Sequence, residues 1–253
     1  MSGAGIQGSV AVVTGASGNL GPVWIKALAD AGAVVVGIDL EQTQVEGAVT
    51  VEAGDVRDAA AIDAIAERVA SEHGEPGILV NSAGIDQPPG PGSGGGVEDI
   101  PIGEFRKVLD VNVAGTFNVT RSIGSRMARG GGGSIVNIGS LYAGIAPVPS
   151  FYDHLVPAFL KPPAYGASKA AVVNLTRYFA RLWGPAGVRV NTLSPGGVAG
   201  GQDPEFVRKF SARVPLGRLA DPEELAGPLL FLASEQSRYV TGQELLVDGG
   251  FTA

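Results

Sequence analysis

The chain has 253 residues, of which 45% are hydrophobic and 17% charged, and its formal net charge at pH 7 is −7. This size predicts one large core and a single domain over residues 1–253, and the acidic balance with dispersed basic residues argues against a nucleic-acid partner. There is no cysteine, and His73 and His154 stand far apart without acidic motifs, so we expect neither disulfides nor a metal site.

The beginning of the chain carries no targeting signal that we can identify. Residues 1–15 lack a basic segment followed by an apolar one, and no apolar stretch approaches the ~18 residues needed to cross a bilayer. We therefore expect a soluble, cytoplasmic protein with no membrane partner.

Short apolar segments alternate with helical patterns along the chain. The segments lie at 10–15, 33–39, 48–53, 77–84, 134–140, 188–195 and 244–250. Apolar residues recur at helical spacing after the first and third segments: Leu20, Val23, Trp24, Ala27 and Leu28, then Ile62, Ile65, Ala66 and Val69. Strands without polar alternation are buried on both faces, so the pattern predicts an α/β fold: a doubly wound parallel sheet of about seven strands, the Rossmann fold, in three α/β/α layers.

Glycine-rich and Asp-Pro segments mark the connections. We expect a flexible surface loop at 88–96 (PPGPGSGGG) and a tight helix-to-strand connection at 130–133 (GGGG). Helices are predicted around 203–212 and 221–234, each opened by Asp-Pro.

The segment TGASGNLG at 14–21 follows an apolar strand and opens a helix. In that context a glycine loop brings backbone N–H groups and a helix N-terminus to a pyrophosphate. Asp39 closes the second strand, where its carboxylate can accept hydrogen bonds from an adenosine ribose and repel a 2′-phosphate, and no basic residue follows it before Arg57. The pattern predicts NAD as cofactor, although an aspartate at a strand end can also simply cap a turn.

Tyr165 and Lys169 stand four residues apart in YGASK and therefore share one helix face. An ammonium at that spacing can lower the pKa of the phenol, which makes the tyrosine a candidate general acid or base. Tyr142, Tyr152 and Tyr178 lack a lysine four residues on. A single tyrosine on a helix usually has only a packing role. The acid/base role is indicated by the combination of the Tyr/Lys pair with the glycine loop.

Several motifs occur in one order along the chain: TGASGNLG, Asp55-Val56, NSAG at 81–84, VNVAGTF at 111–117, Ser140, YGASK, SPGG at 194–197 and VTGQELLVDGG. In this order the chain resembles the short-chain dehydrogenase/reductase family over essentially its whole length. The resemblance implies hydride transfer between an alcohol and a nicotinamide on the pro-S face, and assembly as a homotetramer.

The resemblance also assigns roles to residues. Ser140 would bind the substrate oxygen, Tyr165 would be the acid/base, Lys169 would hold the nicotinamide ribose, and Asn112 would hold a water that relays protons to Lys169. The expected cofactor-binding residues are Gly15, Ser17, Gly18, Asn19, Leu20, Gly21, Asp39, Leu40, Asp55, Val56, Asn81, Ser82, Ala83, Gly84, Tyr165, Lys169, Pro195, Gly196, Gly197 and Val198.

The chain departs from the pattern of the compact family members at three places. Gly18 and Asn19 give TGxxGxxG, where the compact members have TGxxxGxG. The threonine that often follows Pro-Gly is replaced by Gly197 and Val198, so that backbone groups or Gln202 would have to take its role. Third, Ser140 and Tyr165 are 25 residues apart, which is longer than the family spacing.

The additional length forms an insert at 141–164, between two proposed catalytic residues. We expect it to be an active-site wall, with Ser140, Tyr142, Tyr152, His154 and Tyr165 as substrate-binding candidates; the alternative is an outlying loop that packs on a neighbouring subunit. Its mixture of polar and apolar groups suits a sugar, sugar acid, polyol or cyclic alcohol as well as a hydrophobic ketone. By resemblance, residues 198–216 would form a mobile lid.

These observations predict an NAD(H)-dependent oxidoreductase that interconverts a secondary alcohol and a ketone. One alternative is an NADPH-dependent 3-ketoacyl or other carbonyl reductase, which conflicts with Asp39. Another is a non-catalytic NAD(H)-sensing regulator, a class that usually dispenses with the Tyr/Lys pair retained here.

Overall fold

The structure is a computed structural model that describes residues 5–89, 95–157 and 159–253. Most of the loop predicted at 88–96 falls on residues 90–94 and so lies outside the described residues. In the part of the chain that is described, no helix has both the length and the apolar character needed to cross a membrane.

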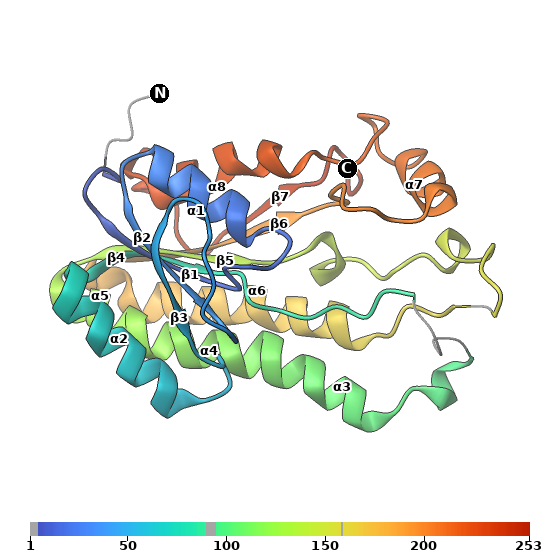
Figure 1. Ribbon diagram of the computed structural model, residues 1–253. Helices are drawn as coiled ribbons and strands as arrows, with labels where there is room; N and C mark the ends of the chain where they lie inside the picture. Colours follow the sequence, from blue (N-terminus) through green and yellow to red (C-terminus); the bar gives the residue numbers. More distant parts are fainter. Residues whose placement is uncertain (1–4, 90–94, 158) are drawn as a thin grey trace.

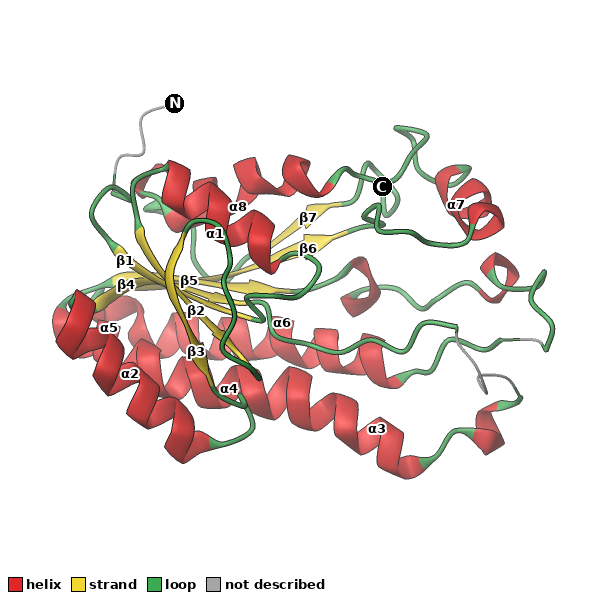
Figure 2. Cartoon of the chain, in the orientation of Figure 1, coloured by secondary structure: helices red, strands yellow, loops and turns green. Residues whose placement is uncertain are grey.

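A seven-stranded parallel sheet forms the centre of the molecule, as predicted (Figure 2). In spatial order its strands are β3 (Ala48–Ala53), β2 (Val34–Asp39), β1 (Val10–Thr14), β4 (Pro76–Asn81), β5 (Gly133–Ile138), β6 (Val188–Pro195) and β7 (Glu244–Val247). β1 and β5 are buried along nearly their whole length, which explains why their sequences are continuously apolar.

Helices cover both faces of the sheet (Figure 1). One layer contains α1 (Gly21–Asp30) and α8 (Ala226–Ala233), whose Trp24, Leu28, Leu229 and Leu232 pack in one core cluster. The opposite layer contains α2 (Ala59–His73), α3 (Ile102–Leu109), α4 (Thr116–Val119), α5 (Ser125–Gly130) and α6 (Ala164–Trp183). α7 (Pro204–Ser211) lies beyond the carboxyl ends of β6 and β7.

The helical segment that carries Asn112 is irregular. Two π-helical segments, Asp110–Gly115 and Thr120–Gly124, separate α3, α4 and α5. The Thr116 hydroxyl donates a 2.8 Å hydrogen bond to the Asn112 carbonyl oxygen, and the Asn112 side chain is buried. π turns of this kind are frequent at functional sites because they redirect a side chain.

The strand order places a ligand site between β1 and β4. The chain runs from β1 through β2 to β3 on one side and from β4 through β5 and β6 to β7 on the other. At such a switch point the two connecting loops diverge and leave a crevice at the carboxyl ends of the strands. The loops there are the glycine segment after Thr14 and the segment after Asn81.

Candidate active site

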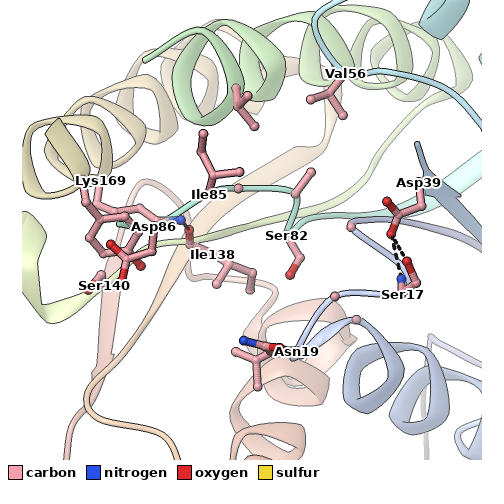
Figure 3. A pocket seen from close by; sticks show the side chains of 18 of the residues that line it. Ser17, Asn19, Asp39, Val56, Ser82, Ile85, Asp86, Ile138, Ser140 and Lys169 are labelled. Atoms are coloured by element: carbon pink, nitrogen blue, oxygen red, sulfur yellow. Dashed lines mark hydrogen bonds between the residues drawn. The ribbon is translucent and has the colours of Figure 1, made fainter. Parts of the chain in front are cut away.

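A cavity of about 560 Å³ occupies the crevice at the carboxyl ends of the strands. We call it the main cavity. Figure 3 shows Ser17 and Asp39 at one end and Ser140, Asp86 and Lys169 at the other. Its size is within the range of about 300–1,000 Å³ that is typical of cofactor and ligand sites.

The glycine loop is held tightly against the segment that follows β4. Thr14 Oγ1 accepts hydrogen bonds of 3.1 Å from the backbone N–H groups of Ser82 and Ala83. Gly15 has φ +69°, and a Cβ there would lie 2.9 Å from Ala83 Cα. A side chain at Gly21 would meet the Gly15 carbonyl oxygen at 2.2 Å, so the loop geometry requires glycine at both positions.

The N-terminus of α1 faces the main cavity without a cap of its own. Leu20, at the N-cap position, makes no side-chain hydrogen bond, and the first turn contains no acidic residue. Gly18, Asn19, Leu20 and Gly21 line the cavity. Free backbone N–H groups and the positive end of the helix dipole are the features that bind an anion.

Asp39 fastens this loop to the end of β2. Its Oδ2 accepts hydrogen bonds from Ser17 N at 2.8 Å and Ser17 Oγ at 2.6 Å, and its Oδ1 accepts one from Leu40 N at 2.8 Å. Partial burial opposes ionisation, but these hydrogen bonds prevail and the pKa of Asp39 is lowered. The carboxylate is thus charged, and Asp39 is part of the cavity wall. Its contact with a ribose stays a prediction.

Three of the expected cofactor-binding residues line the main cavity near Asp39. Leu40, Asp55 and Val56 line the cavity, as does Arg57. Arg57 Nη2 is 2.5 Å from Asp55 Oδ2, and Arg57 Nε donates to both carboxylate oxygens at 3.0 Å. The charge of this arginine is therefore matched by a neighbouring carboxylate.

Ser140, Tyr165 and Lys169 meet at the opposite end of the main cavity. Lys169 Nζ donates a 2.7 Å hydrogen bond to the Ile138 carbonyl oxygen and lies 5.6 Å from the centre of the Tyr165 ring. Burial lowers the pKa of Lys169 to about 8, while the charge of Asp86 acts in the opposite direction. The structure thus brings three of the four proposed catalytic side chains together at this end of the cavity.

We expected Lys169 to lower the pKa of the tyrosine, but in this structure the pKa of Tyr165 is raised. Burial raises the pKa of Tyr165 well above its ordinary value, and the negative charge of Asp86 raises it further. A hydrogen bond from Ser140 lowers it in part. The Lys169 ammonium donates its hydrogen bond to the Ile138 carbonyl oxygen. The net shift of the Tyr165 pKa is set by burial and is upward.

Asn112 connects the helical layer to the cavity wall. Its Oδ1 accepts a 2.8 Å hydrogen bond from Ile85 N, and its Nδ2 donates to the Ile85 carbonyl oxygen and to Ser168 Oγ, both at 3.0 Å. The side chain therefore fixes the segment after β4 next to the helix of Tyr165. Its role in a water relay stays a prediction.

Two expected cofactor residues do not line the main cavity. Asn81 is buried behind it, where its Nδ2 donates to Thr120 Oγ1 at 2.9 Å and to Asn137 Oδ1 at 2.8 Å. Gly197 faces Phe210 and Leu219, and a Cβ there would lie 2.6 Å from each. The neighbouring candidates Ser82, Ala83, Gly84, Pro195, Gly196 and Val198 do line it.

The insert packs against α7, and three substrate candidates lie in that contact. We call the buried group of Leu141, Phe151, Tyr152, Phe159, Phe210, Val214 and Leu219 the insert–α7 cluster. Tyr152 stacks on Phe206, and His154 Nε2 lies 2.7 Å from Asp203 Oδ1. Tyr142 packs at the edge of the cluster, and Tyr142, Tyr152 and His154 are not among the residues that line the main cavity.

Gln202, considered as a substitute for the missing threonine, bonds to its own loop. Its Oε1 accepts from Gly200 N at 2.8 Å, and its Nε2 donates to the Val198 carbonyl oxygen at 2.7 Å.

The structure adds cavity residues that sequence reasoning missed. They are Ile38, Gly54, Arg57, Ile85, Asp86, Lys107, Val111, Ile138 and Gly139. Asp86 could have been found, because it stands two residues after NSAG and is an acidic residue near the carboxyl end of a predicted strand. Lys161, which contacts Asp86, stands among prolines in the insert and carried no such signal.

Comparison with known proteins agrees with this geometry. The family model described as enoyl-(acyl carrier protein) reductase matches residues 15–252. The chain is 36% identical to D-threitol dehydrogenase from Mycolicibacterium smegmatis, covering 98% of this chain and 94% of that protein. It is 37% identical to galactitol 2-dehydrogenase from Rhizobium johnstonii, covering 98% and 96%.

A solved structure shares the whole fold. The short chain dehydrogenase from Leptospira borgpetersenii with bound NAD+ superposes with a TM-score of 0.88 at 33% identity, covering 98% of this chain and 94% of that one. The chain belongs to the short-chain dehydrogenase/reductase family of oxidoreductases.

Proposed function

We propose that this protein is an NAD(H)-dependent dehydrogenase that interconverts a secondary alcohol and a ketone on a small polyol or sugar derivative. One observation carries the proposal. Ser140, Tyr165 and Lys169 stand at one end of a cavity whose other end is the glycine loop and Asp39. A redox cofactor bound by the glycine loop and Asp39 would extend along the cavity toward these three side chains.

The residues present fit a dinucleotide. The uncapped N-terminus of α1 suits a pyrophosphate, and the close approach at Gly15 and Gly21 leaves the loop backbone exposed to it. Asp39 is charged and suits a ribose with free hydroxyls better than one with a 2′-phosphate. A bound nicotinamide would supply the hydride chemistry at the carbinol carbon.

The side chains then supply the proton chemistry. In the reducing direction the raised pKa of Tyr165 keeps the phenol protonated, so that it can donate its proton to the substrate oxygen while Ser140 hydrogen-bonds the same oxygen. In the oxidising direction Tyr165 would have to release its own proton, against its raised pKa, before its oxygen can accept the proton of the substrate hydroxyl. Lys169, buried beside the Tyr165 ring, would hold the ribose end of the cofactor.

The polyol class is supported by relatives that are named for threitol and galactitol. A ketoacyl reductase that uses NADPH is disfavoured by the charge of Asp39. A regulator without turnover is disfavoured because Ser140, Tyr165 and Lys169 all converge on the cavity.

The test is an activity panel with both cofactors. We expect D-threitol, galactitol or a related polyol to reduce NAD+ with a kcat/KM at least tenfold above that with NADP+. Preferential reduction of a 3-ketoacyl thioester by NADPH would favour the reductase. Tight NADH binding without turnover of any alcohol would favour the regulator.

Assembly and location also belong to the proposal. We expect a homotetramer in the cytoplasm. Light scattering on the purified protein tests the first expectation, and a mass close to that of one chain would contradict it.

A further inference from the structure

An ion pair outside the proposed catalytic set stands beside the tyrosine. Lys161, from the insert, places its Nζ 2.5 Å from Asp86 Oδ2 and 3.4 Å from the Gln87 carbonyl oxygen. Lys161 Nζ is also 5.5 Å from the centre of the Tyr165 ring, about the same separation as Lys169 Nζ at 5.6 Å. The pair joins the segment after β4 to the insert at the site of proton transfer.

The two partners are buried to very different degrees. The side chain of Lys161 is 5% exposed and that of Asp86 is 42% exposed. Asp86 lines the main cavity, at the same end as Ser140 and Lys169 (Figure 3). Since the lysine is enclosed by protein, the pair presents a carboxylate, and not an ammonium, to whatever occupies the cavity.

The carboxylate of Asp86 still has acceptor capacity. Oδ1 accepts a 2.7 Å hydrogen bond from Gln87 N, and Oδ2 accepts the one from Lys161. An ionised carboxylate offers about four acceptor positions, so roughly two are used by none of the residues that the structure describes. Asp86 is also close enough for its charge to raise the pKa of Tyr165.

We propose that Asp86, held in place by Lys161, is a specificity-determining residue that accepts a hydrogen bond from a substrate hydroxyl adjacent to the reacting carbinol. The site would thereby select neutral vicinal diols and polyols. This inference rests on the proposed function and narrows its substrate class. A monohydric alcohol would cover the carboxylate without giving it a donor, and a carboxylated substrate would bring a second negative charge against it.

The test compares two alcohols that differ by one hydroxyl: 2,3-butanediol and 2-butanol. For wild type, Asp86→Ala, Asp86→Asn and Lys161→Met, kcat and KM are measured with NAD+ for both alcohols. Lys209→Met is the matched control, because Lys209 also pairs the insert with a neighbouring element, through Asp153, but does not line the main cavity.

We expect Asp86→Ala to lower the ratio of kcat/KM for the diol to that for 2-butanol by roughly 10- to 100-fold, the value of a hydrogen bond to a charged group. Most of this loss should be in KM for the diol. Asp86→Asn keeps a carbonyl acceptor and should recover part of the ratio. Lys161→Met should lower it less than Asp86→Ala, and Lys209→Met should leave it unchanged.

An equal loss for both alcohols in Asp86→Ala would mean that the pair only braces the insert, and it would overturn the inference. An unchanged ratio would overturn it as well. Failure of the proposed function has another signature, since wild type would then oxidise neither alcohol. In that case the thermal shift of the NADH-bound protein decides. A larger shift with the diol than with 2-butanol, lost in Asp86→Ala, supports the subsite, and equal shifts refute it.

Discussion

The two ends of the main cavity are assembled from different kinds of sequence. At the dinucleotide end, Thr14, Ser17 and Asp39 come from two adjacent strands and the loop between β1 and α1, and backbone geometry fixes them. At the substrate end, Asp86 and Lys161 lie 75 residues apart and meet only because the insert folds back over Tyr165.

Because of this difference, the shape of the glycine loop is fixed, whereas the insert can vary in sequence. The glycine loop tolerates no side chain at Gly15 or Gly21, so its shape is set by sterics. The insert is held by the aromatic insert–α7 cluster and by ion pairs such as that of Lys209 with Asp153. Packing of that kind can change without disturbing the sheet, which is how one scaffold accommodates different substrates.

The largest expected effect lies at the substrate end of the main cavity, at Tyr165. Tyr165→Phe removes the proton donor and acceptor but keeps the ring, so we expect kcat to fall by about 10²- to 10⁴-fold. NADH affinity should change by less than about threefold, because the dinucleotide end is built from other residues. Steady-state kinetics and a fluorescence titration with NADH measure the two quantities.

The matched control for that variant is Tyr178→Phe on the same helix. Tyr178 is 58% exposed and should lose a hydroxyl without effect. Retention of wild-type kcat by Tyr165→Phe would exclude this phenol as the acid/base.

Much of the fold could be predicted because its signals are local. Continuous apolar strands and helical spacing identified the sheet and its order of elements, and the loop at Gly15 marked the end of the cavity that we propose for the dinucleotide. The raised pKa of Tyr165 could not be predicted from its spacing of four residues to Lys169. It depends on the burial of the phenol and on the charge of Asp86, which the spacing does not reveal. The π turn at Asn112 and the contacts of Lys161 likewise arise from tertiary packing.

At the dinucleotide end, Asp39→Asn tests cofactor selection with little change of shape. The amide can still accept from Ser17, but the negative charge is lost. We expect NADH affinity to fall by about 10-fold and NADPH affinity to rise, since a charge-assisted hydrogen bond is roughly twice as strong as a neutral one. Isothermal titration with both cofactors measures this, with Asp30→Asn at the exposed end of α1 as control. An unchanged preference would mean that Asp39 only fastens the loop.

At the substrate end, replacing residues 145–157 by a short Gly-Ser linker tests whether the insert selects the substrate. We expect relative kcat/KM values over a polyol and cyclic-alcohol panel to change by about 10-fold, because removal of Phe151 and Tyr152 dismantles the insert–α7 cluster. NADH affinity in the same variant should stay within about twofold. Unchanged relative rates would place the insert outside substrate selection.

The smallest expected effect concerns stability. It measures the free-energy cost of burying the charged Lys169 at the substrate end of the cavity. The pKa of Lys169 is about 8 in the folded protein and 10.5 ordinarily. Between these values the unfolded chain binds more protons, so stability rises with pH there. The penalty of burying this lysine is therefore complete below about pH 8 and has vanished near pH 10.5.

Lys169→Met should consequently stabilise the cofactor-free protein at pH 7 by about 1 to 3 kcal/mol while it abolishes turnover. Part of the gain is lost with the hydrogen bond to Ile138. Thermal melts at pH 7 and pH 10 measure it, and we expect the advantage over wild type to shrink at the higher pH. Lys26→Met, at an exposed i,i+4 pair on α1, should leave the melting temperature nearly unchanged at both values. If Lys169→Met were less stable than wild type at pH 7, burial of the charged lysine would carry no net free-energy cost. The ammonium would then be a stabilising structural contact, and not a buried charge retained for chemistry.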